Sequence, residues 1–184
     1  MSLKHGILGL LSYGSMTGYD VKKLFSESLN FFWNTQTSQI YRELDTIEKK
    51  EWVTSEYIVQ NDKPNKKVFT LSDKGTSELV RWLDEHSVEN TLKIRDEMTM
   101  RVFFGANGDK GALKKELIEY KKMNEEFYER LKKSEGELDY REKLTDKNGE
   151  KIYWLMAIKR GYYTATSNIH WVDECLKLIE EEEN

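Results

Sequence analysis

The feature that most constrains the fold of this 184-residue chain is a seven-residue hydrophobic repeat near its C-terminal end. Apolar side chains recur at alternating steps of three and four positions, so they share one stripe of a single long helix. Such a stripe must pack lengthwise against another helix. The repeat therefore predicts a helical second half, and we expect a dimer interface to form from Leu155, Ile158, Tyr162, Ile169, Val172, Leu176 and Ile179.

A second helix is predicted between Asp109 and Ser134, where apolar residues also step by four and three. Its apolar positions are Leu113, Leu117, Tyr120, Phe127 and Leu131. Asn124 occupies the remaining core position of that pattern. A polar residue there can fix helix register or partner choice, or it can mark an exposed kink or the end of a bundle. The sequence leaves both interpretations open.

The first half of the chain contains three predicted helices. The first covers Leu3–Ser12, and the second begins after an N-cap at Thr17 and runs to about Ser28. The third lies within the stretch Trp33–Lys50 and ends near Lys50. On this third helix one face is apolar and the opposite face is polar; the apolar side chains are Ile40, Leu44 and Ile47, and the polar ones are Ser38, Arg42, Asp45 and Lys49.

A two-stranded hairpin is predicted directly after the third helix. Trp52–Gln60 and Lys66–Leu71 have strand composition, and the five residues 61–65 between them have turn chemistry. Ser72 then caps a fourth helix, Asp73–Asp84, which we expect to be buried through Leu79, Val80, Trp82 and Leu83. Three helices followed by a hairpin is the order of a winged helix-turn-helix, whose third helix enters the DNA major groove.

Charge supports DNA binding only locally. The whole chain has a net charge of −4, and residues 1–86 carry 11 basic and 12 acidic side chains. The tip of the predicted hairpin is basic, however, because Lys63, Lys66 and Lys67 face only Asp62. Three lysines at the place where a wing meets the DNA backbone indicate phosphate contacts. A lysine-rich tip is also a common protection of edge strands against aggregation.

Three motifs of the first half resemble the winged-helix domain of PadR-type transcriptional regulators. Gly18-Tyr19-Asp20 is similar to the family's start of helix two, although Thr17 stands where histidine is frequent. Ile40-Tyr41-Arg42-Glu43-Leu44 resembles the recognition helix. The wing return is similar to the stretch from Lys67 to Gly75, with Phe69 in place of a common tyrosine. Residues 93–105 and 152–180 resemble the C-terminal helical domain of the longer PadR subfamily.

The resemblance implies a dimeric repressor that binds an inverted-repeat operator and responds to a small molecule or to stress. With the residue pattern, it assigns candidate DNA contacts on the second helix, the third helix and the wing. Ser38, Gln39 and Arg42 are expected at base edges or nearby phosphates, and Tyr41 at a phosphate. The full candidate set is Thr17, Tyr19, Thr37, Ser38, Gln39, Tyr41, Arg42, Lys63, Asn65, Lys66 and Lys67.

The chain is also rich in aromatic residues, which line many small-molecule sites. Most aromatic residues at helical spacing belong to a core. The resemblance nevertheless implies an aromatic or phenolic effector bound between the two halves. The expected effector contacts are Trp33, Trp154, Tyr163 and Trp171.

An enzymatic function finds no support in the sequence. His5, His86 and His170 are scattered, so no metal-ligand spacing exists, and we expect no metal or cofactor. There is no glycine-rich phosphate loop, nucleophile elbow, membrane-spanning run or signal peptide. The single cysteine, Cys175, excludes an internal disulfide framework and is typical of a cytoplasmic protein.

The sequence thus predicts a mainly α-helical chain with a small β-hairpin wing. Residues 1–86 would form a winged helix-turn-helix DNA-binding domain, and residues 91–184 a helical, coiled-coil-like dimerisation domain. The predicted function is a DNA-binding transcriptional regulator. The alternative is a winged-helix protein–protein interaction module that lacks sequence-specific DNA binding, which the nearly neutral first half keeps open.

Overall fold

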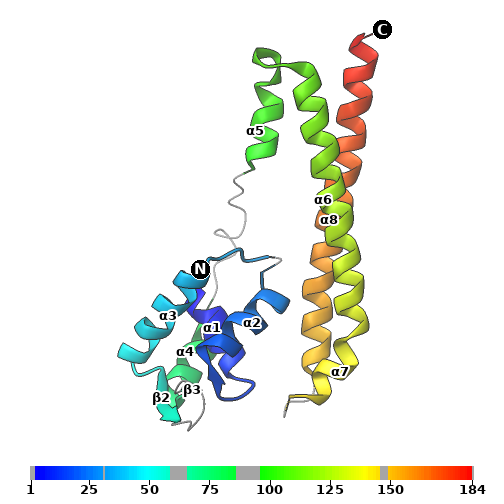
Figure 1. Cartoon of the computed structure of the whole chain (residues 1–184). Coiled ribbons are helices and arrows are strands. Elements are labelled where there is room, and N and C mark those ends of the chain that lie inside the picture. Colours follow the sequence, from blue (N-terminus) through cyan, green and yellow to red (C-terminus); the bar gives the residue numbers. More distant parts are fainter. Residues whose placement is uncertain (1–2, 31, 59–65, 86–95, 146–148, 184) are drawn as a thin grey trace. The chain divides into compact units, whose positions relative to one another are not determined.

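The computed structural model describes residues 3–30, 32–58, 66–85, 96–145 and 149–183 (Figure 1). The chain divides into two compact units, Met1–Glu89 and Asn90–Asn184. None of the described helices is both long enough and apolar enough to cross a membrane.

The first unit is a winged helix-turn-helix. Its elements in chain order are α1 (Leu3–Leu11), β1 (Met16–Thr17), α2 (Gly18–Ser28), α3 (Thr37–Lys49), β2 (Val53–Ile58), β3 (Lys66–Leu71) and α4 (Asp73–Asp84). The predicted helices and both strands of the hairpin are therefore present, and their bounds agree with the expected ones to within about two residues.

The sheet has three antiparallel strands in the order β1-β3-β2. Ser55 pairs with Phe69 in the β2–β3 hairpin, and Met16 pairs with the same Phe69 from the other side. The strand β1 was not predicted. Two residues are too few to show the alternating pattern by which a strand is recognised in sequence.

One apolar core joins the three helices to the base of the wing. Its buried members come from α1, α2, α3, β2 and β3, namely Ile7, Leu8, Leu10, Leu11, Val21, Phe25, Ile40, Leu44, Ile47, Val53 and Phe69. The strands contribute only their ends nearest α4, so the wing leaves the core as it extends. The core therefore fixes the root of the wing and leaves its outer half exposed.

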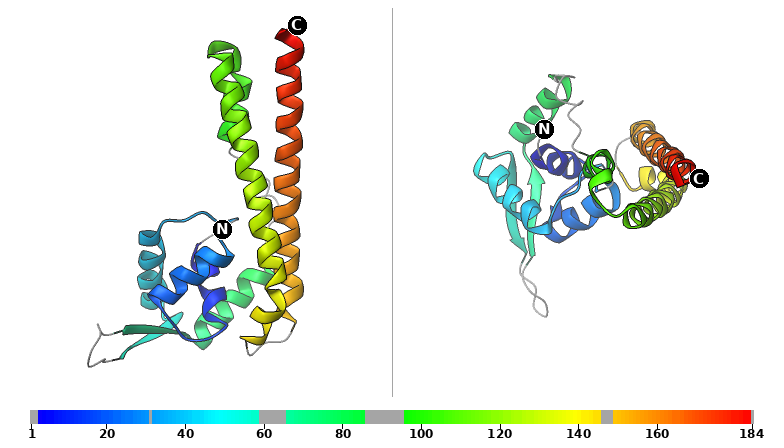
Figure 2. Two further views of the ribbon diagram at one scale, coloured as in Figure 1. Left: turned by 45° about the vertical axis from the view of Figure 1, so that its right-hand side comes forward. Right: turned by 90° about the horizontal axis from the view of Figure 1, so that it is seen from above.

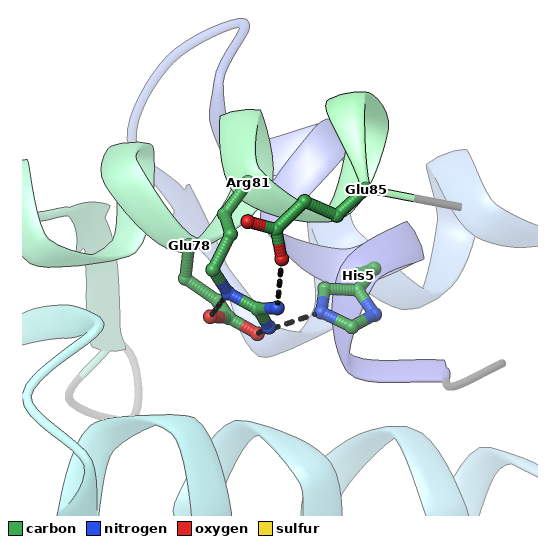
Figure 3. A network of polar contacts seen from close by, with 4 residues as sticks. All are labelled: His5, Glu78, Arg81 and Glu85. Atoms are coloured by element: carbon green, nitrogen blue, oxygen red, sulfur yellow. Dashed lines mark hydrogen bonds and ion pairs between the residues drawn. The ribbon is translucent and has the colours of Figure 1, made fainter. Parts of the chain in front are cut away.

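A polar clamp joins α1 to α4 (Figure 3). Nε2 of His5 lies 3.0 Å from a carboxylate oxygen of Glu78, and the imidazole stacks on the Trp82 ring at 4.7 Å. Arg81 binds Glu78 and Glu85 on the solvent side. Burial lowers the pKa of His5. The hydrogen bonds from Arg81 and His5 lower the pKa of Glu78 to about 2.

The expected burial of α4 is wrong for two residues. Val80 and Leu83 are 50% and 57% exposed. Leu79 packs against the core and Trp82 stacks on His5 of α1, and both are half-buried beside the buried Gly75. At about 100° per residue, Val80 and Leu83 point along the neighbouring face. The helix was therefore predicted correctly, but its buried stripe is narrower than expected.

The second unit is entirely helical in its described residues. It consists of α5 (Glu97–Phe103), the single-turn helix η2 (Gly105–Asn107), α6 (Lys110–Gly136), α7 (Leu138–Lys143) and α8 (Glu150–Glu183). The helices α6 and α8 lie side by side in both views of Figure 2. They run antiparallel, because Lys110 pairs with Glu182 and Lys121 with Asp173.

Asn124 lies inside the α6–α8 contact and is only 8% exposed. Its Nδ2 donates to the carbonyl of Tyr120, and its Oδ1 accepts a hydrogen bond of 2.9 Å from Nδ2 of Asn168. The exposed kink that the sequence left open is therefore excluded. The amide group joins α6 to α8 of the same chain.

The heptad repeat of α8 is satisfied partly within the chain. Ile158, Ala165 and Val172 recur every seven residues and are buried in this unit, and Leu155, Tyr162, Ile169, Leu176 and Ile179 are half-buried beside them. Ile158 and Val172 were expected at a dimer interface. Since they are covered without a second chain, any such interface must use other residues of the unit.

Candidate nucleic-acid interface

The helix α3 presents one polar face because three side chains hold the opposite face in the core. Ile40, Leu44 and Ile47 are buried, as predicted. Ser38 and Arg42 lie on the exposed face and make no side-chain hydrogen bond or ion pair with the described part of the chain. A helix fixed in this way can offer hydroxyl and guanidinium groups to base edges in a major groove.

Gln39 has a structural role at the start of α3. Its Oε1 accepts hydrogen bonds from the backbone N–H of Gln36 at 3.1 Å and from Oγ1 of Thr35 at 2.8 Å. These bonds satisfy one of the free N–H groups that precede a helix. Only the Nε2 amide of Gln39 is then left to donate to DNA. Thr37, at the first helical position, is exposed.

The start of α2 is also fixed by capping. Thr17 accepts from the backbone N–H of Asp20 and donates to its carboxylate, and Asp20 accepts from the backbone N–H of Thr17. The side chain of Thr17 is therefore engaged in capping α2, although the sequence predicted it as a DNA contact. Tyr19 is next to it, is 63% exposed and points away from the core.

Two residues of the family motifs, Gly18 and Tyr41, pack closely against each other. A Cβ on Gly18 would lie 2.7 Å from Cε1 of Tyr41, so only glycine allows the tyrosine ring to cross the start of α2. Tyr41 remains 43% exposed, as a side chain on the flank of the interface would be.

The structure separates the predicted lysines of the wing. Lys66 is exposed, and its side chain makes no ion pair with the described residues. Lys67 donates a 2.6 Å hydrogen bond to Glu48 of α3, which raises the pKa of Lys67 and lowers the pKa of Glu48. Lys63 and Asn65, also predicted to bind DNA, lie outside the described residues. Lys66 is therefore the described wing lysine best placed for a phosphate.

Sequence reasoning missed Tyr57, which is 70% exposed on β2. Its register partner is Lys67, so the ring lies on the sheet face that carries Ser55 and Lys67, beside α3. The alternation of Val53, Ser55 and Tyr57 would have placed it on that face. An exposed aromatic ring beside a recognition helix can contact deoxyribose or a base edge.

The aromatic residues predicted to bind an effector occupy two separate places. Trp33 lines a pocket of about 470 Å³ next to α3, together with Asn34, Thr35, Gln39 and Arg42. Trp154, Tyr163 and Trp171 are on α8, and Trp171 packs edge-on against Tyr120. Trp154 and Trp171 are about 26 Å apart along the helix axis. One small ligand cannot touch both within a single chain.

Among the residues that the structure describes, no three His, Cys, Asp or Glu side chains gather as metal ligands would. Cys175 is half-buried, and burial raises the pKa of its thiol. An elevated pKa disfavours the thiolate, which is the reactive form of cysteine.

Comparison with known proteins assigns both halves of the chain. Residues 7–81 match the transcriptional regulator PadR-like family, and residues 94–180 match the family described as virulence activator alpha C-term. Residues 7–81 therefore form a PadR-like domain. The chain is a DNA-binding transcriptional regulator of PadR type with a winged-helix fold.

Two curated relatives carry regulator names. The chain is 40% identical over 103 residues to the negative transcriptional regulator PadR of Bacillus subtilis. The aligned stretch covers 55% of this chain and 56% of that protein. A probable transcriptional regulator of Mycobacterium tuberculosis is 29% identical over 197 residues, covering 98% of this chain and 99% of that protein.

Solved structures of the PadR-like family resemble the whole chain. The crystal structure of Bacillus subtilis PadR in complex with operator DNA has a TM-score of 0.78 at 26% identity. The alignment covers 96% of this chain and 98% of the PadR chain. The same protein in complex with p-coumaric acid has a TM-score of 0.72 at 24% identity, covering 97% and 95%. The second comparison shows likeness of fold alone.

Proposed function

We propose that this PadR-like regulator is a cytoplasmic, dimeric repressor that binds an inverted-repeat operator. The observation that carries the proposal is α3: three buried aliphatic residues hold it, and its exposed Ser38 and Arg42 project beside a wing. Bacillus subtilis PadR, whose structure resembles 96% of this chain, has been solved in complex with operator DNA, and this supports DNA as the partner. Dimer symmetry would place two such helices about one turn of DNA apart.

Each part of the surface has a distinct proposed role. Ser38, Arg42 and the Nε2 amide of Gln39 would read base edges, and Tyr41 would donate its hydroxyl to a phosphate. Lys66 would bind the backbone from the wing, together with Lys63 and Asn65. Tyr19 would contact the backbone from α2, and Thr17 and Thr37 would support these contacts from the two helix starts.

The dimer is supported by apolar side chains that the second unit leaves uncovered. No residue of α5 is buried, and Phe103 is 80% exposed beside an exposed Phe104. On α8, Met156 and Tyr163 point away from the buried stripe and are also exposed. Exposed apolar patches of this kind mark interaction sites. We propose that they are covered by the same helices of a second copy.

An aromatic acid is the proposed effector, as p-coumaric acid is bound by Bacillus subtilis PadR. Because Trp154 and Trp171 are too far apart to share one ligand within a chain, the proposed contacts are alternatives: Trp154, Tyr163 or Trp171 of α8, or Trp33 beside α3. Thermal-shift screening with small aromatic acids tests this: a stabilising member that also releases DNA is expected. If no member stabilises the protein or releases DNA, the effector proposal is wrong.

The DNA-binding proposal is tested by gel-shift titration with the DNA upstream of the protein's own gene, at two salt concentrations. Because phosphate contacts release counterions, specific binding should weaken steeply as salt rises. A random duplex of equal length is the control and should bind more weakly at each salt concentration.

The second candidate function is a winged-helix module that binds another protein. It is favoured by one observation, the near balance of 11 basic and 12 acidic side chains in residues 1–86. DNA-binding domains are more often basic. The same titration decides between the two, because a protein-interaction module would show no salt-sensitive shift of either duplex.

A further inference from the structure

Glu48 connects the recognition helix to both strands of the wing. It lies in the last turn of α3, and its two carboxylate oxygens have different partners. Oε1 accepts a hydrogen bond from the hydroxyl of Ser55 on β2, and Oε2 accepts one of 2.6 Å from Nζ of Lys67 on β3. The side chains of Lys67 and Glu48 are only 27% and 31% exposed.

The contact occurs where the wing leaves the core. Val53 and Phe69 are buried at the root, whereas Glu56, Tyr57 and Ile58 further along β2 are exposed. The chain between α3 and β2 is only three residues long, and it includes Glu51 at a φ of 59°. A link beyond the root therefore limits how far the outer hairpin can swing relative to α3.

Lys67 is held in this position by more than charge. Its Nζ lies 4.9 Å from the centre of the buried Phe69 ring and 5.9 Å from that of Tyr57. A phosphate contact would require the ammonium to leave a carboxylate and two aromatic rings. Lys66 needs no such exchange, because its side chain is exposed and makes no ion pair with the described residues.

We propose that Glu48, Ser55 and Lys67 form a latch that fixes the angle between recognition helix and wing, and that Lys67 positions the DNA-binding surface without touching DNA. The inference rests on the proposed DNA-binding function. It reassigns Lys67 from the phosphate contacts predicted by the sequence, and it adds Glu48 and Ser55 as positioning residues.

The test compares Glu48→Gln, Lys67→Met and the double variant with the wild type, using full-length protein. Lys66→Ala is the control for a true phosphate contact. Dissociation constants are measured over a series of salt concentrations for two duplexes: one selected by the wild-type protein from a random library, and one unselected. Ser55→Ala, which removes one arm of the latch, replaces any variant that fails to fold by circular dichroism.

If the latch exists, Glu48→Gln and Lys67→Met should weaken DNA binding to the same extent. Each single variant should bind the selected duplex about fivefold more weakly, the order of effect of losing a partly exposed ion pair. The double variant should be no weaker than either single one, because the interaction is shared. Lys67→Met should keep the wild-type salt slope, whereas Lys66→Ala should reduce it by about one.

Two results would overturn the inference alone. One is a salt slope that falls for Lys67→Met as it does for Lys66→Ala, because Lys67 would then bind a phosphate. The other is tighter binding of both duplexes by Glu48→Gln, because Glu48 would then merely withhold a lysine from DNA. A wild-type protein without salt-dependent binding would instead overturn the DNA-binding function, and the inference with it.

Discussion

Gly75 has no room for a side chain, and this fixes the contact between α4 and the root of the wing. A Cβ there would lie 1.9 Å from the carbonyl oxygen of Trp52. We expect Gly75→Ala to lower the free energy of unfolding by about 1–3 kcal/mol, as overpacking does. Gly9→Ala is the control, since its Cβ would meet nothing within 4 Å; it should stabilise α1 by about 0.5–1 kcal/mol. Chemical denaturation measures both, and equal effects would refute the steric explanation.

Arg42 and Lys66 should fail in different ways when replaced by alanine. Arg42 lies on the exposed face of α3, where we propose that it makes a bidentate base contact. Its loss should then reduce discrimination between operator and random DNA by about 1–3 kcal/mol. Lys66 lies on the wing, so its loss should weaken both duplexes alike. Competition gel shifts give the two ratios. If Arg42→Ala weakens both duplexes equally, Arg42 does not read bases.

The sequence predicted the orientation of α3 but not the partners of the polar residues around it. Periodicity placed the buried and exposed faces of α3 correctly, because a helix fixes the direction of each side chain. It could not show that Lys67 is bound by Glu48 or that Gln39 caps its own helix. Those partners are set by hairpin register and by the path of the chain before α3, and neither is encoded in a local pattern.

Between elements, the α1–α4 clamp makes stability depend on pH. Burial lowers the pKa of His5 from its ordinary 6.5, so below that pH the unfolded chain binds a proton that the folded chain resists. The contribution of His5 is therefore complete above pH 6.5 and decreases as the pH falls. Glu78, whose pKa is lowered from 4.5 to about 2, adds a further loss below pH 4.5.

We expect His5→Gln to remove the part of the pH dependence that begins near pH 6.5 and to leave the part below pH 4.5. Melting temperatures measured between pH 8 and pH 4 show both parts. His170→Gln on α8, where the side chain is exposed, is the matched control for the replacement of a histidine. An unchanged curve for His5→Gln would show that another group titrates.

The α6–α8 contact should respond to Asn124 and Asn168 as a pair. Asn124→Leu leaves the amide of the half-buried Asn168 without its partner, and we expect a cost of about 1 kcal/mol, the lower end of the range for a buried polar group. The double replacement Asn124→Leu/Asn168→Leu should recover most of that loss, because both polar groups are then gone. Urea denaturation of the three proteins measures the coupling. Additive losses would mean that the hydrogen bond between the two amides carries no energy.

For the whole molecule, the unburied helix α5 gives the sharpest prediction. Phe103→Ser should raise the dissociation constant of the dimer about 30-fold or more, the effect of losing an aromatic anchor at an interface. Sedimentation equilibrium measures this change. Val80→Ser, which removes an exposed aliphatic side chain of the first unit, is the control and should leave association unchanged. If Phe103→Ser dimerises as the wild type does, α5 is not the interface.

The heptad repeat predicted long packed helices but could not say which chain supplies the partner. Intramolecular and intermolecular packing use the same spacing of apolar residues. Ile158 and Val172 were consequently assigned to a dimer interface and are buried within the chain. The uncovered residues of α5 lie in a helix of seven residues, which is too short for the repeat to be visible.

The cap at the start of α3 has a consequence for how this regulator can evolve. Gln39 would donate to DNA with one atom of its amide while the other holds the helix start. Its replacement would alter operator preference and destabilise the recognition helix together. The side chains of Ser38 and Arg42 make no structural hydrogen bond or ion pair within the described residues. Descendants of this chain should therefore acquire new operators first through Ser38 and Arg42, with Gln39 changing only after a substitute cap has appeared.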